Sequence, residues 1–306
     1  MSQKKTPKRA ITEEDSTLPG LPFAEENPID AGGDQITYPD VSSITGAALS
    51  EIRPESRAKA LKGAQLLAKC LKLEGVDVLF GYPGGANLEI FDVLRDYGIR
   101  CIRVEHEQGA VHAAEGFARA TGRPGVCLAT SGPGATNLVT GIADANSDSV
   151  PVVAITGNVP SPLLGKNAFQ EVDIVSVTAP ITKRSYQVQR VGHIPAVVRH
   201  AFLMATGNRP GPVLMDLPKD IQQHYPRDPD GNYAPPRMPA VIERLEEPVG
   251  GIPADQLDEA CRIIREARRP VIYAGGGVIA SDTSPWLIQL AEKLGCPVTT
   301  TIMGLG

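Results

Sequence analysis

Hydrophobic residues recur at helical spacing from about residue 59, and we expect the first folded element there. The apolar positions follow the i, i+3, i+4 pattern of one helix face, while lysines occupy the opposite face. Gly75 is a helix stop signal, so the helix is expected to end near it. The residues of the apolar face are Leu61, Ala64, Leu67, Ala68 and Leu71.

Short apolar runs then alternate with helical stretches. The predicted buried strands are Val76–Phe80, Ile99–Val104, Val126–Thr130, Val152–Thr156 and Val213–Leu217. The predicted helices are Leu88–Tyr97, His106–Ala120, Ala135–Ala145 and Ile194–Thr206. Strands that alternate with helices predict the α/β class with a doubly wound parallel sheet. Ligands of such sheets bind at the carboxyl ends of the strands.

The composition along the chain predicts four segments. Residues 1–58 carry scattered Pro, Gly, Ser and charges without apolar periodicity, which predicts a flexible extension. The sheet domain is assigned to residues 59–225, and residues 226–253 are rich in Pro and turn residues, as in a linker. Residues 254–306 read as the start of a second α/β domain that stops directly after a strand, so we expect the chain to be incomplete. Its predicted elements are the helix Asp255–Ala267, the strand Val271–Ala274, the helix Trp286–Leu294 and the strand Val298–Thr301.

The overall composition narrows the classes of partner. Hydrophobic residues make up 42%, charged residues 21%, and the net charge is −5, which argues against nucleic acid as a partner. No apolar run approaches the length of a membrane span, and the N-terminal residues resemble neither a signal nor a transit peptide. Five cysteines without Cys-x-x-Cys spacing predict reduced thiols in a cytoplasmic protein. The histidines show no metal-ligand spacing, so we assign no metal ligand in this chain.

Three glycine-rich turns and one glutamate are the candidate chemical features. The turns Gly81–Gly85, Ser131–Asn137 and Gly275–Gly277 follow predicted strands, where glycine lets a ligand approach the backbone. None has the Walker pattern or a full Gly-x-Gly-x-x-Gly fingerprint, and each alone is most simply a tight turn. Glu107 lies where a strand passes into a helix, at the ligand-facing end of the sheet. A solvated glutamate in the first helical turn is the alternative.

Seven motifs resemble acetohydroxyacid synthase (acetolactate synthase), and they occur in the order and at the spacing of that family. The resemblance as a whole covers residues 59–225 strongly and residues 253–306 more weakly. The motifs are GYPGGA (Gly81–Ala86), EHEQGA (Glu105–Ala110), TSGPGATN (Thr130–Asn137), AFQE (Ala168–Glu171), ITK (Ile181–Lys183), RPGPV (Arg209–Val213) and DLPKDIQ (Asp216–Gln222).

The resemblance implies an enzyme that decarboxylates pyruvate with thiamine diphosphate and joins the product to a second 2-ketoacid. This is the first common step of branched-chain amino-acid synthesis. Glu107 matches the glutamate that shares a proton with the aminopyrimidine ring, so that the cofactor acts as its own base. Implied residues on the aminopyrimidine side are Tyr82, Pro133, Asn137 and Gln170, and those near the substrate are Gly85, Ala86, Phe169 and Lys219. Implied FAD-binding residues are Arg209, Gly275, Gly276, Thr301 and Ile302.

The resemblance also implies Mg²⁺, held by residues beyond Gly306, and a homodimer or homotetramer. Preference for 2-ketobutyrate over pyruvate and the binding of a small regulatory subunit stay open. The chain departs from the family at Lys166-Asn167 and at Asn158, which affects the expected shape of the substrate entrance.

Two other classes of function compete with this interpretation. The first is another thiamine-diphosphate carboligase, decarboxylase or oxidase, and the second is a non-catalytic module that binds nucleotide or FAD. Glu107 together with Gln170 argues against the non-catalytic module, since binding alone needs no proton-sharing carboxylate.

Overall fold

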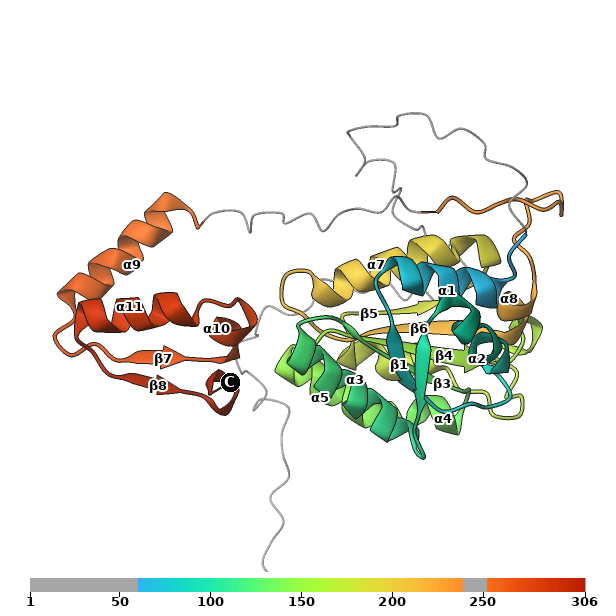
Figure 1. Cartoon of the computed structure of the whole chain (residues 1–306), viewed down its shortest axis with the longest axis horizontal. Coiled ribbons are helices and arrows are strands. Elements are labelled where there is room, and N and C mark those ends of the chain that lie inside the picture. Colours follow the sequence, from blue (N-terminus) through green and yellow to red (C-terminus); the bar gives the residue numbers. More distant parts are fainter. Residues whose placement is uncertain (1–59, 239–251, 306) are drawn as a thin grey trace, which may run out of the picture. The chain divides into compact units, whose positions relative to one another are not determined.

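The computed structural model describes residues 60–238 and 252–305, shown in Figure 1. The predicted flexible extension at residues 1–58 and residues 239–251 of the predicted linker lie outside the described residues. The described part of that linker contains one antiparallel bridge, between Arg227 and Tyr233. No helix in the described ranges combines the length and apolar character needed to cross a membrane.

Residues 60–238 form a six-stranded parallel sheet in the order β2-β1-β3-β4-β6-β5. This confirms the predicted α/β class and parallel sheet. Each strand read from an apolar run is present, with ends shifted by at most two residues. The strands are β1 Val78–Gly81, β2 Arg100–Arg103, β3 Gly125–Ala129, β4 Val152–Asn158, β5 Arg184–Gln187 and β6 Val213–Pro218.

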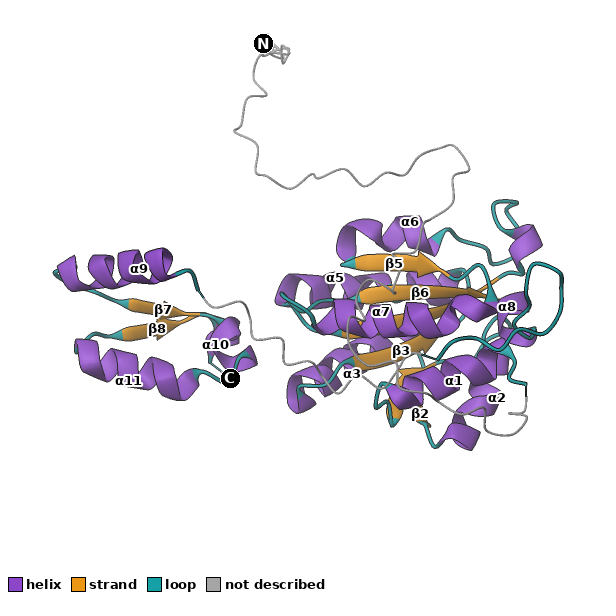
Figure 2. Cartoon of the chain, turned by 90° about the horizontal axis from the view of Figure 1, so that it is seen from above, coloured by secondary structure: helices purple, strands orange, loops and turns teal. Residues whose placement is uncertain are grey.

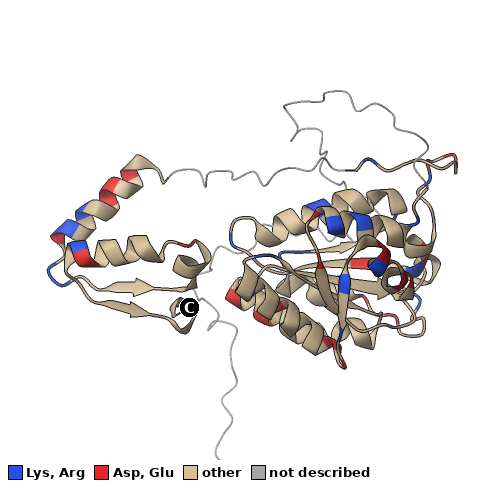
Figure 3. Ribbon diagram, in the orientation of Figure 1, with Lys and Arg blue, Asp and Glu red and all other residues tan. Residues whose placement is uncertain are grey.

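Helices cover both faces of this sheet (Figure 2). One face carries α1 Gly63–Leu73, α2 Leu88–Leu94, α7 Ile194–Thr206 and α8 Lys219–Gln223. The other carries α3 Glu107–Thr121, α4 Pro133–Thr136, α5 Val139–Asp148 and α6 Ile174–Thr178. Single 3₁₀ turns lie at Arg95–Tyr97, Ser161–Leu163, Ala179–Ile181 and Val191–His193. In Figure 3 the charged residues of α1 are basic and those of α5 are acidic.

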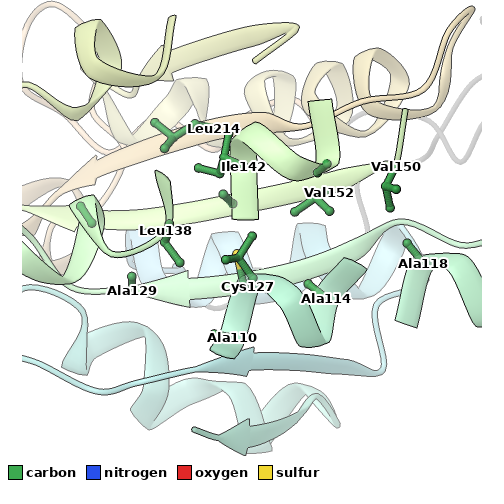
Figure 4. Packing of buried hydrophobic residues seen from close by; sticks show 14 of the residues in the cluster. Ala110, Ala114, Ala118, Cys127, Ala129, Leu138, Ile142, Val150, Val152 and Leu214 are labelled. Atoms are coloured by element: carbon green, nitrogen blue, oxygen red, sulfur yellow. The ribbon is translucent and has the colours of Figure 1, made fainter. Parts of the chain in front are cut away.

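Small residues let α3 lie directly on the sheet (Figure 4). Ala110, Ala114 and Ala118 are buried on one side of α3, against Cys127 of β3. A Cβ on Gly125 would lie 2.0 Å from the carbonyl oxygen of Ala114, so only glycine fits there. All five cysteines are free thiols, as predicted, and burial raises the pKa of Cys127 to about 12.

Four elements differ from the prediction for physical reasons. The edge strand β5 has the polar sequence RSYQ and pairs with β6 alone, so it carries no apolar run. The helix predicted at Ala135–Ala145 is two helices, because α4 already begins at Pro133, and Asn137 and Leu138, which keep right-handed helical dihedrals, separate it from α5. Helices α6 and α8 have five residues each, too few to show a helical period.

Residues 252–305 form a two-stranded parallel sheet with flanking helices. Its elements are α9 Ala254–Glu266, β7 Ile272–Ala274, α10 Gly276–Ala280, α11 Ser284–Leu294, β8 Val298–Thr300 and the 3₁₀ turn Ile302–Gly304. The four predicted elements are present. The expected glycine turn Gly275–Gly277 was only partly right, because Gly275 precedes α10 and the next two glycines lie inside that helix.

A largely buried ion pair between Glu74, which directly follows α1, and Arg199 of α7 leads to a prediction about pH. Arg199 Nε lies 3.0 Å from Glu74 Oε1, and the two side chains are 13% and 8% exposed. Burial raises the pKa of Glu74 to about 6, against the opposing effect of Arg199. The folded state therefore holds this proton to higher pH than the unfolded state. The contribution to the free energy of unfolding falls as pH rises from about 4.5 to about 6, by about 2 kcal/mol.

Urea unfolding of the parent and of Glu74→Gln at pH 4.5 and pH 7 measures this contribution. We expect the variant to lose that part of the pH dependence, whereas Glu105→Gln, at an 84% exposed side chain, should keep it. An unchanged pH dependence in Glu74→Gln would show that Glu74 titrates normally.

Candidate active site

The predicted cofactor residues gather where adjacent strands end. Glu107 begins α3 after β2, the turn Gly81–Ala86 follows β1, and the turn Thr130–Asn137 follows β3. Since β2, β1 and β3 are neighbours and parallel, these three segments meet at one edge of the sheet.

Glu107 is a mostly buried carboxylate with one oxygen engaged. The residue is 8% exposed, and its Oε2 accepts a hydrogen bond of 2.9 Å from Asn137 Nδ2. Oε1 accepts no hydrogen bond from the described part of the chain. A Cβ on Gly134 would lie 3.0 Å from Oε1, so glycine keeps the space beside this oxygen open. The carboxylate is thus fixed on one side and available on the other.

Thr130 joins the two glycine turns. Its Oγ1 accepts a hydrogen bond of 3.2 Å from the Ala86 amide. A Cβ on either Gly84 or Gly134 would lie 2.6 Å from the Thr130 side chain, so both turns need glycine to close around it. The sequence contains Thr130 in a motif but gives no reason to select it, because the Ala86 amide that it binds lies 44 residues away along the chain.

Asn87 closes the first turn from inside. It is fully buried, its Oδ1 accepts a bond of 2.7 Å from the Gly84 amide, and its Nδ2 donates to the carbonyl oxygen of Tyr82 at 3.2 Å. These two bonds hold Tyr82 and the exposed Gly85 in a defined backbone path. Sequence analysis missed Asn87, whose only signal was an asparagine before a helix.

The loop that carries Phe169 and Gln170 packs against the second glycine turn. A Cβ on Gly132 would lie 2.6 Å from the carbonyl oxygen of Gln170, so the two backbones touch. Gln170 has a φ of 57°, a strained value for a residue with a side chain. Phe169 is 87% exposed, and Gln170 and Pro133 are exposed as well. The structure therefore brings Gln170 beside the turn that holds Pro133 and Asn137.

Lys219 and Ala86 lie on the predicted substrate side. Lys219 is the first residue of α8, directly after β6, and is half-buried. Its ammonium group has no hydrogen-bond or ion-pair partner in the described ranges. Ala86 is buried, and its carbonyl oxygen accepts a bond of 2.7 Å from Gln222 Nε2 of α8.

Arg209 is not placed with this group. It precedes β6 and lies at the opposite edge of the sheet from Glu107, where the strands begin. Its Nε donates to Ser149 Oγ at 2.7 Å, and its Nη2 donates to the Ser147 carbonyl at 3.2 Å. The guanidinium is exposed and keeps further donors for an anion.

The remaining predicted FAD residues meet at the carboxyl ends of β7 and β8. The Thr301 amide donates to the Ala274 carbonyl at 2.9 Å, which sets the ends of the two strands side by side. Gly275 faces Thr301, and a Cβ on Gly276 would lie 3.0 Å from Met303 Cβ. Ile302 is 87% exposed. The structure thus brings Gly275, Gly276, Thr301 and Ile302 together.

The sequence did not predict a cluster of three titratable side chains, His112, Glu115 and Asp144. His112 Nδ1 lies 2.7 Å from Glu115 Oε2, and Asp144 of α5 is next to them. Burial is the main cause that raises the pKa of Glu115. His112 and Glu115 lie one helical turn apart on α3, but Asp144 comes from α5, so only the fold reveals the cluster.

Comparison with known proteins identifies two domains in the chain. The family described as "Thiamine pyrophosphate enzyme, N-terminal TPP binding domain" matches residues 61–177. The family described as "Thiamine pyrophosphate enzyme, central domain" matches residues 257–306.

Individual relatives carry one name. The chain is 51% identical over 246 residues to "Acetolactate synthase 3, chloroplastic" of Brassica napus, which covers 80% of this chain and 37% of the relative. It is 49% identical over 251 residues to "Probable acetolactate synthase large subunit" of Methanocaldococcus jannaschii, which covers 80% of this chain and 41% of the relative. It is 47% identical over 247 residues to "Acetolactate synthase large subunit" of Buchnera aphidicola, which covers 80% and 42%. The chain therefore spans about two fifths of the length of these relatives.

Proposed function

Because this chain belongs to the thiamine pyrophosphate enzymes, we propose that it forms the aminopyrimidine-binding side of an acetolactate synthase. The reaction decarboxylates pyruvate and joins the two-carbon product to a second 2-ketoacid, either pyruvate or 2-ketobutyrate. Three relatives that are 47 to 51% identical and carry the name acetolactate synthase support this choice over other members of the family.

The observation that carries the proposal is the half-engaged carboxylate of Glu107. Asn137 fixes Oε2 at 2.9 Å, and the glycine at position 134 leaves Oε1 accessible. An aminopyrimidine ring nitrogen needs one partner of this kind, a positioned oxygen in a largely dry setting. The residues therefore fit thiamine diphosphate, which supplies the carbanion chemistry when it is bound. Glu107 holds or releases a proton at Oε1, and the two glycine turns admit the ring to that oxygen.

The residues that bind the substrate are assigned from their charge and position. A 2-ketoacid is an anion at neutral pH, and the Lys219 ammonium lies on this edge without a hydrogen-bond or ion-pair partner in the described residues. We assign it the carboxylate of the 2-ketoacid. Gly85, Ala86 and the exposed ring of Phe169 supply the remaining wall, on which an apolar methyl or ethyl group can rest.

A flavin, a magnesium ion and an oligomer complete the proposed enzyme. FAD is assigned to Gly275, Gly276, Thr301 and Ile302, which lie together at the carboxyl ends of β7 and β8, with Arg209 binding an anionic part of it. Mg²⁺ is expected on the diphosphate of the thiamine cofactor, and a homodimer or homotetramer is expected as the active form.

A chimera tests the proposed function. Residues 61–306 replace the matched segment of the M. jannaschii relative, which supplies the rest of its own length. With pyruvate, thiamine diphosphate, Mg²⁺ and FAD, we expect acetolactate formation at a rate within about tenfold of the intact relative. A folded chimera that releases acetaldehyde or acetate instead would assign the chain to a decarboxylase or an oxidase. A folded chimera without turnover would support the non-catalytic binding module.

Arg209 provides a separate prediction about FAD. In the chimera, Arg209→Ala should weaken flavin retention by on the order of 1.5–3 kcal/mol, because a charge-assisted contact to the flavin is lost. Bound-flavin absorbance after dialysis measures the effect. Ser149→Gly is the matched control, since it removes the hydroxyl that Arg209 binds but keeps the guanidinium and suits the φ of 60° at this position. Full flavin retention in Arg209→Ala would restrict Arg209 to its contacts with Ser147 and Ser149.

A further inference from the structure

We propose that Asp216 is a positioning residue that fixes Lys219 at the substrate side by binding side chains from both strands beside β6. The inference rests on the proposed function only for the identity of the ligand that Lys219 meets. The position of Lys219 can be measured without any ligand.

Asp216 is fully buried and accepts three hydrogen bonds. Thr156 Oγ1 donates to Oδ1 at 2.7 Å, and Asn158 Nδ2 donates to Oδ2 at 2.7 Å. Gln187 Nε2 donates to Oδ2 at 3.2 Å. Two of these donors come from β4 and one comes from the edge strand β5, so the carboxylate bridges the strands on both sides of β6. Burial is the main cause that raises its pKa.

The same bonds extend into the loop that leaves β4. Asn158 uses its Oδ1 to accept a bond of 2.8 Å from the Val159 amide, so its amide side chain is committed at both ends. Two residues later, the amide and hydroxyl of Ser161 donate to Asp220 Oδ1 of α8 at 2.8 and 3.0 Å. The loop after β4 is therefore tied to β6 and to α8.

Gln222 fixes the other end of α8. It is fully buried, and its Nε2 donates to the carbonyl oxygens of Ala86 at 2.7 Å and Leu217 at 2.8 Å. Because both partners are carbonyl acceptors, the orientation of this amide is determined by the bonds. A Cβ on Gly157 would lie 2.1 Å from the same Ala86 oxygen.

Lys219 lies between these fixed points. Asp216 precedes it by three residues, Asp220 follows it, and Gln222 lies three residues beyond. Each of these buried or half-buried side chains binds a different neighbouring segment, while the ammonium of Lys219 binds none in the described ranges. The arrangement holds the backbone of Lys219 in place and leaves its ammonium group available to bind a ligand.

The hydrogen-bond pattern predicts which substitutions at Asp216 are tolerated. In Asp216→Asn, the new amide can accept from Asn158 and Gln187 with its oxygen and donate to the Thr156 hydroxyl with its nitrogen. All three bonds persist although the charge is lost. In Asp216→Ala, all three donors lose their acceptor, and the side-chain bonds from Asp216 to β4 and β5 are lost, although the backbone pairing of the strands remains. Both variants remove the charge of Asp216, but only Asp216→Ala removes its hydrogen bonds. Comparing them therefore distinguishes positioning by hydrogen bonds from an effect of the charge on Lys219.

The experiment follows Lys219 by NMR in the intact 306-residue chain with ¹³C-methylated lysines. The signal of Lys219 is identified by its loss in Lys219→Arg. We expect Asp216→Ala to move this signal toward the common position of solvent-exposed lysines and to weaken pyruvate binding by about tenfold or more. We expect Asp216→Asn to keep the signal and to bind pyruvate within about twofold of the parent. Methyl pyruvate, which lacks the carboxylate, should cause no shift.

Thr178→Val is the matched control for loss of a buried polar group. Thr178 is equally buried and donates to the Ile174 carbonyl at 2.7 Å, but it binds no residue of the segment from Asp216 to Gln222. This variant should leave the Lys219 signal in place. If Asp216→Ala does not fold, Thr156→Val and Gln187→Ala each remove one of the three donors and should each shift the signal in the same direction.

Each outcome decides a separate claim. An unmoved Lys219 signal in a folded Asp216→Ala, or equal losses in Asp216→Asn and Asp216→Ala, would overturn positioning by hydrogen bonds. A parent chain that shows no response to pyruvate would instead contradict the assignment of Lys219 to the 2-ketoacid. The comparison of the ligand-free signals would still decide the role of Asp216.

Discussion

Replacing Glu107 by glutamine in the chimera is expected to lower acetolactate formation by about 10²–10⁴, the usual contribution of one positioned proton-transfer group. Glutamine keeps the size of the side chain and can still accept the bond from Asn137, which holds Oε2 at 2.9 Å. It cannot share a proton with a ring nitrogen. The fold and the retention of flavin should be unchanged, and the turnover rate measures the loss.

Glu105→Gln is the matched control for this prediction. Glu105 lies two residues earlier in the same connection, and its side chain is 84% exposed and paired with Arg103 at 3.1 Å. Turnover of this control should stay within about threefold of the parent, since an exposed ion pair contributes little. If Glu107→Gln also retained turnover within threefold, Glu107 would have no part in proton transfer.

Gly157→Ala is expected to lower the free energy of unfolding by about 1–3 kcal/mol. A Cβ there would lie 2.1 Å from the Ala86 carbonyl oxygen, so β4 and the first glycine turn must move apart. Because that oxygen also accepts the bond from Gln222, the substitution should disturb the substrate side as well. Urea unfolding of the 306-residue chain measures the loss of stability, and turnover of the chimera measures the second effect.

Gly116→Ala distinguishes this close contact from a general effect of replacing glycine. Gly116 lies inside α3, and a Cβ there meets no atom within 4 Å. Alanine favours a helix over glycine, so this variant should be neutral or more stable by up to about 1 kcal/mol. Equal stability of Gly157→Ala and the parent would mean that the first glycine turn is free to move away from β4.

The amino-acid pattern predicted those parts of the fold whose burial is continuous. Strands β3, β4 and β6 are buried along their whole length and stand out as apolar runs. β5 could not be predicted in this way, because it lies at the edge and only one of its four residues is buried. Its one buried residue, Tyr186, stands among polar neighbours.

The candidate site was predictable only as a location. Parallel topology indicates that Glu107 and the first two glycine turns share an edge, and the structure has them there. The individual contacts depend on distances between segments that are far apart along the chain. The bond from Asn137 to Glu107 spans 30 residues, and the bond from Gln222 to Ala86 spans 136. No local pattern distinguishes Gln222 from an ordinary residue at the end of a short helix.

For Arg209, the family resemblance and the structure supply different information. The RPGPV motif groups it with flavin binding, and the structure shows it at the edge opposite Glu107, bound to Ser147 and Ser149. These two observations describe different surfaces of one domain. FAD and thiamine diphosphate are therefore proposed to meet this sheet domain at separate edges.

A crystal structure of the chimera with thiamine diphosphate and Mg²⁺ tests the central claim most directly, through the distance between Glu107 Oε1 and the nearest aminopyrimidine ring nitrogen. We predict a hydrogen bond of about 2.6–3.2 Å, with Asn137 still bound to Oε2 and the ring lying between the two glycine turns. A bound cofactor whose ring nitrogen lies more than about 4 Å from either carboxylate oxygen of Glu107 would contradict the assignment of this site.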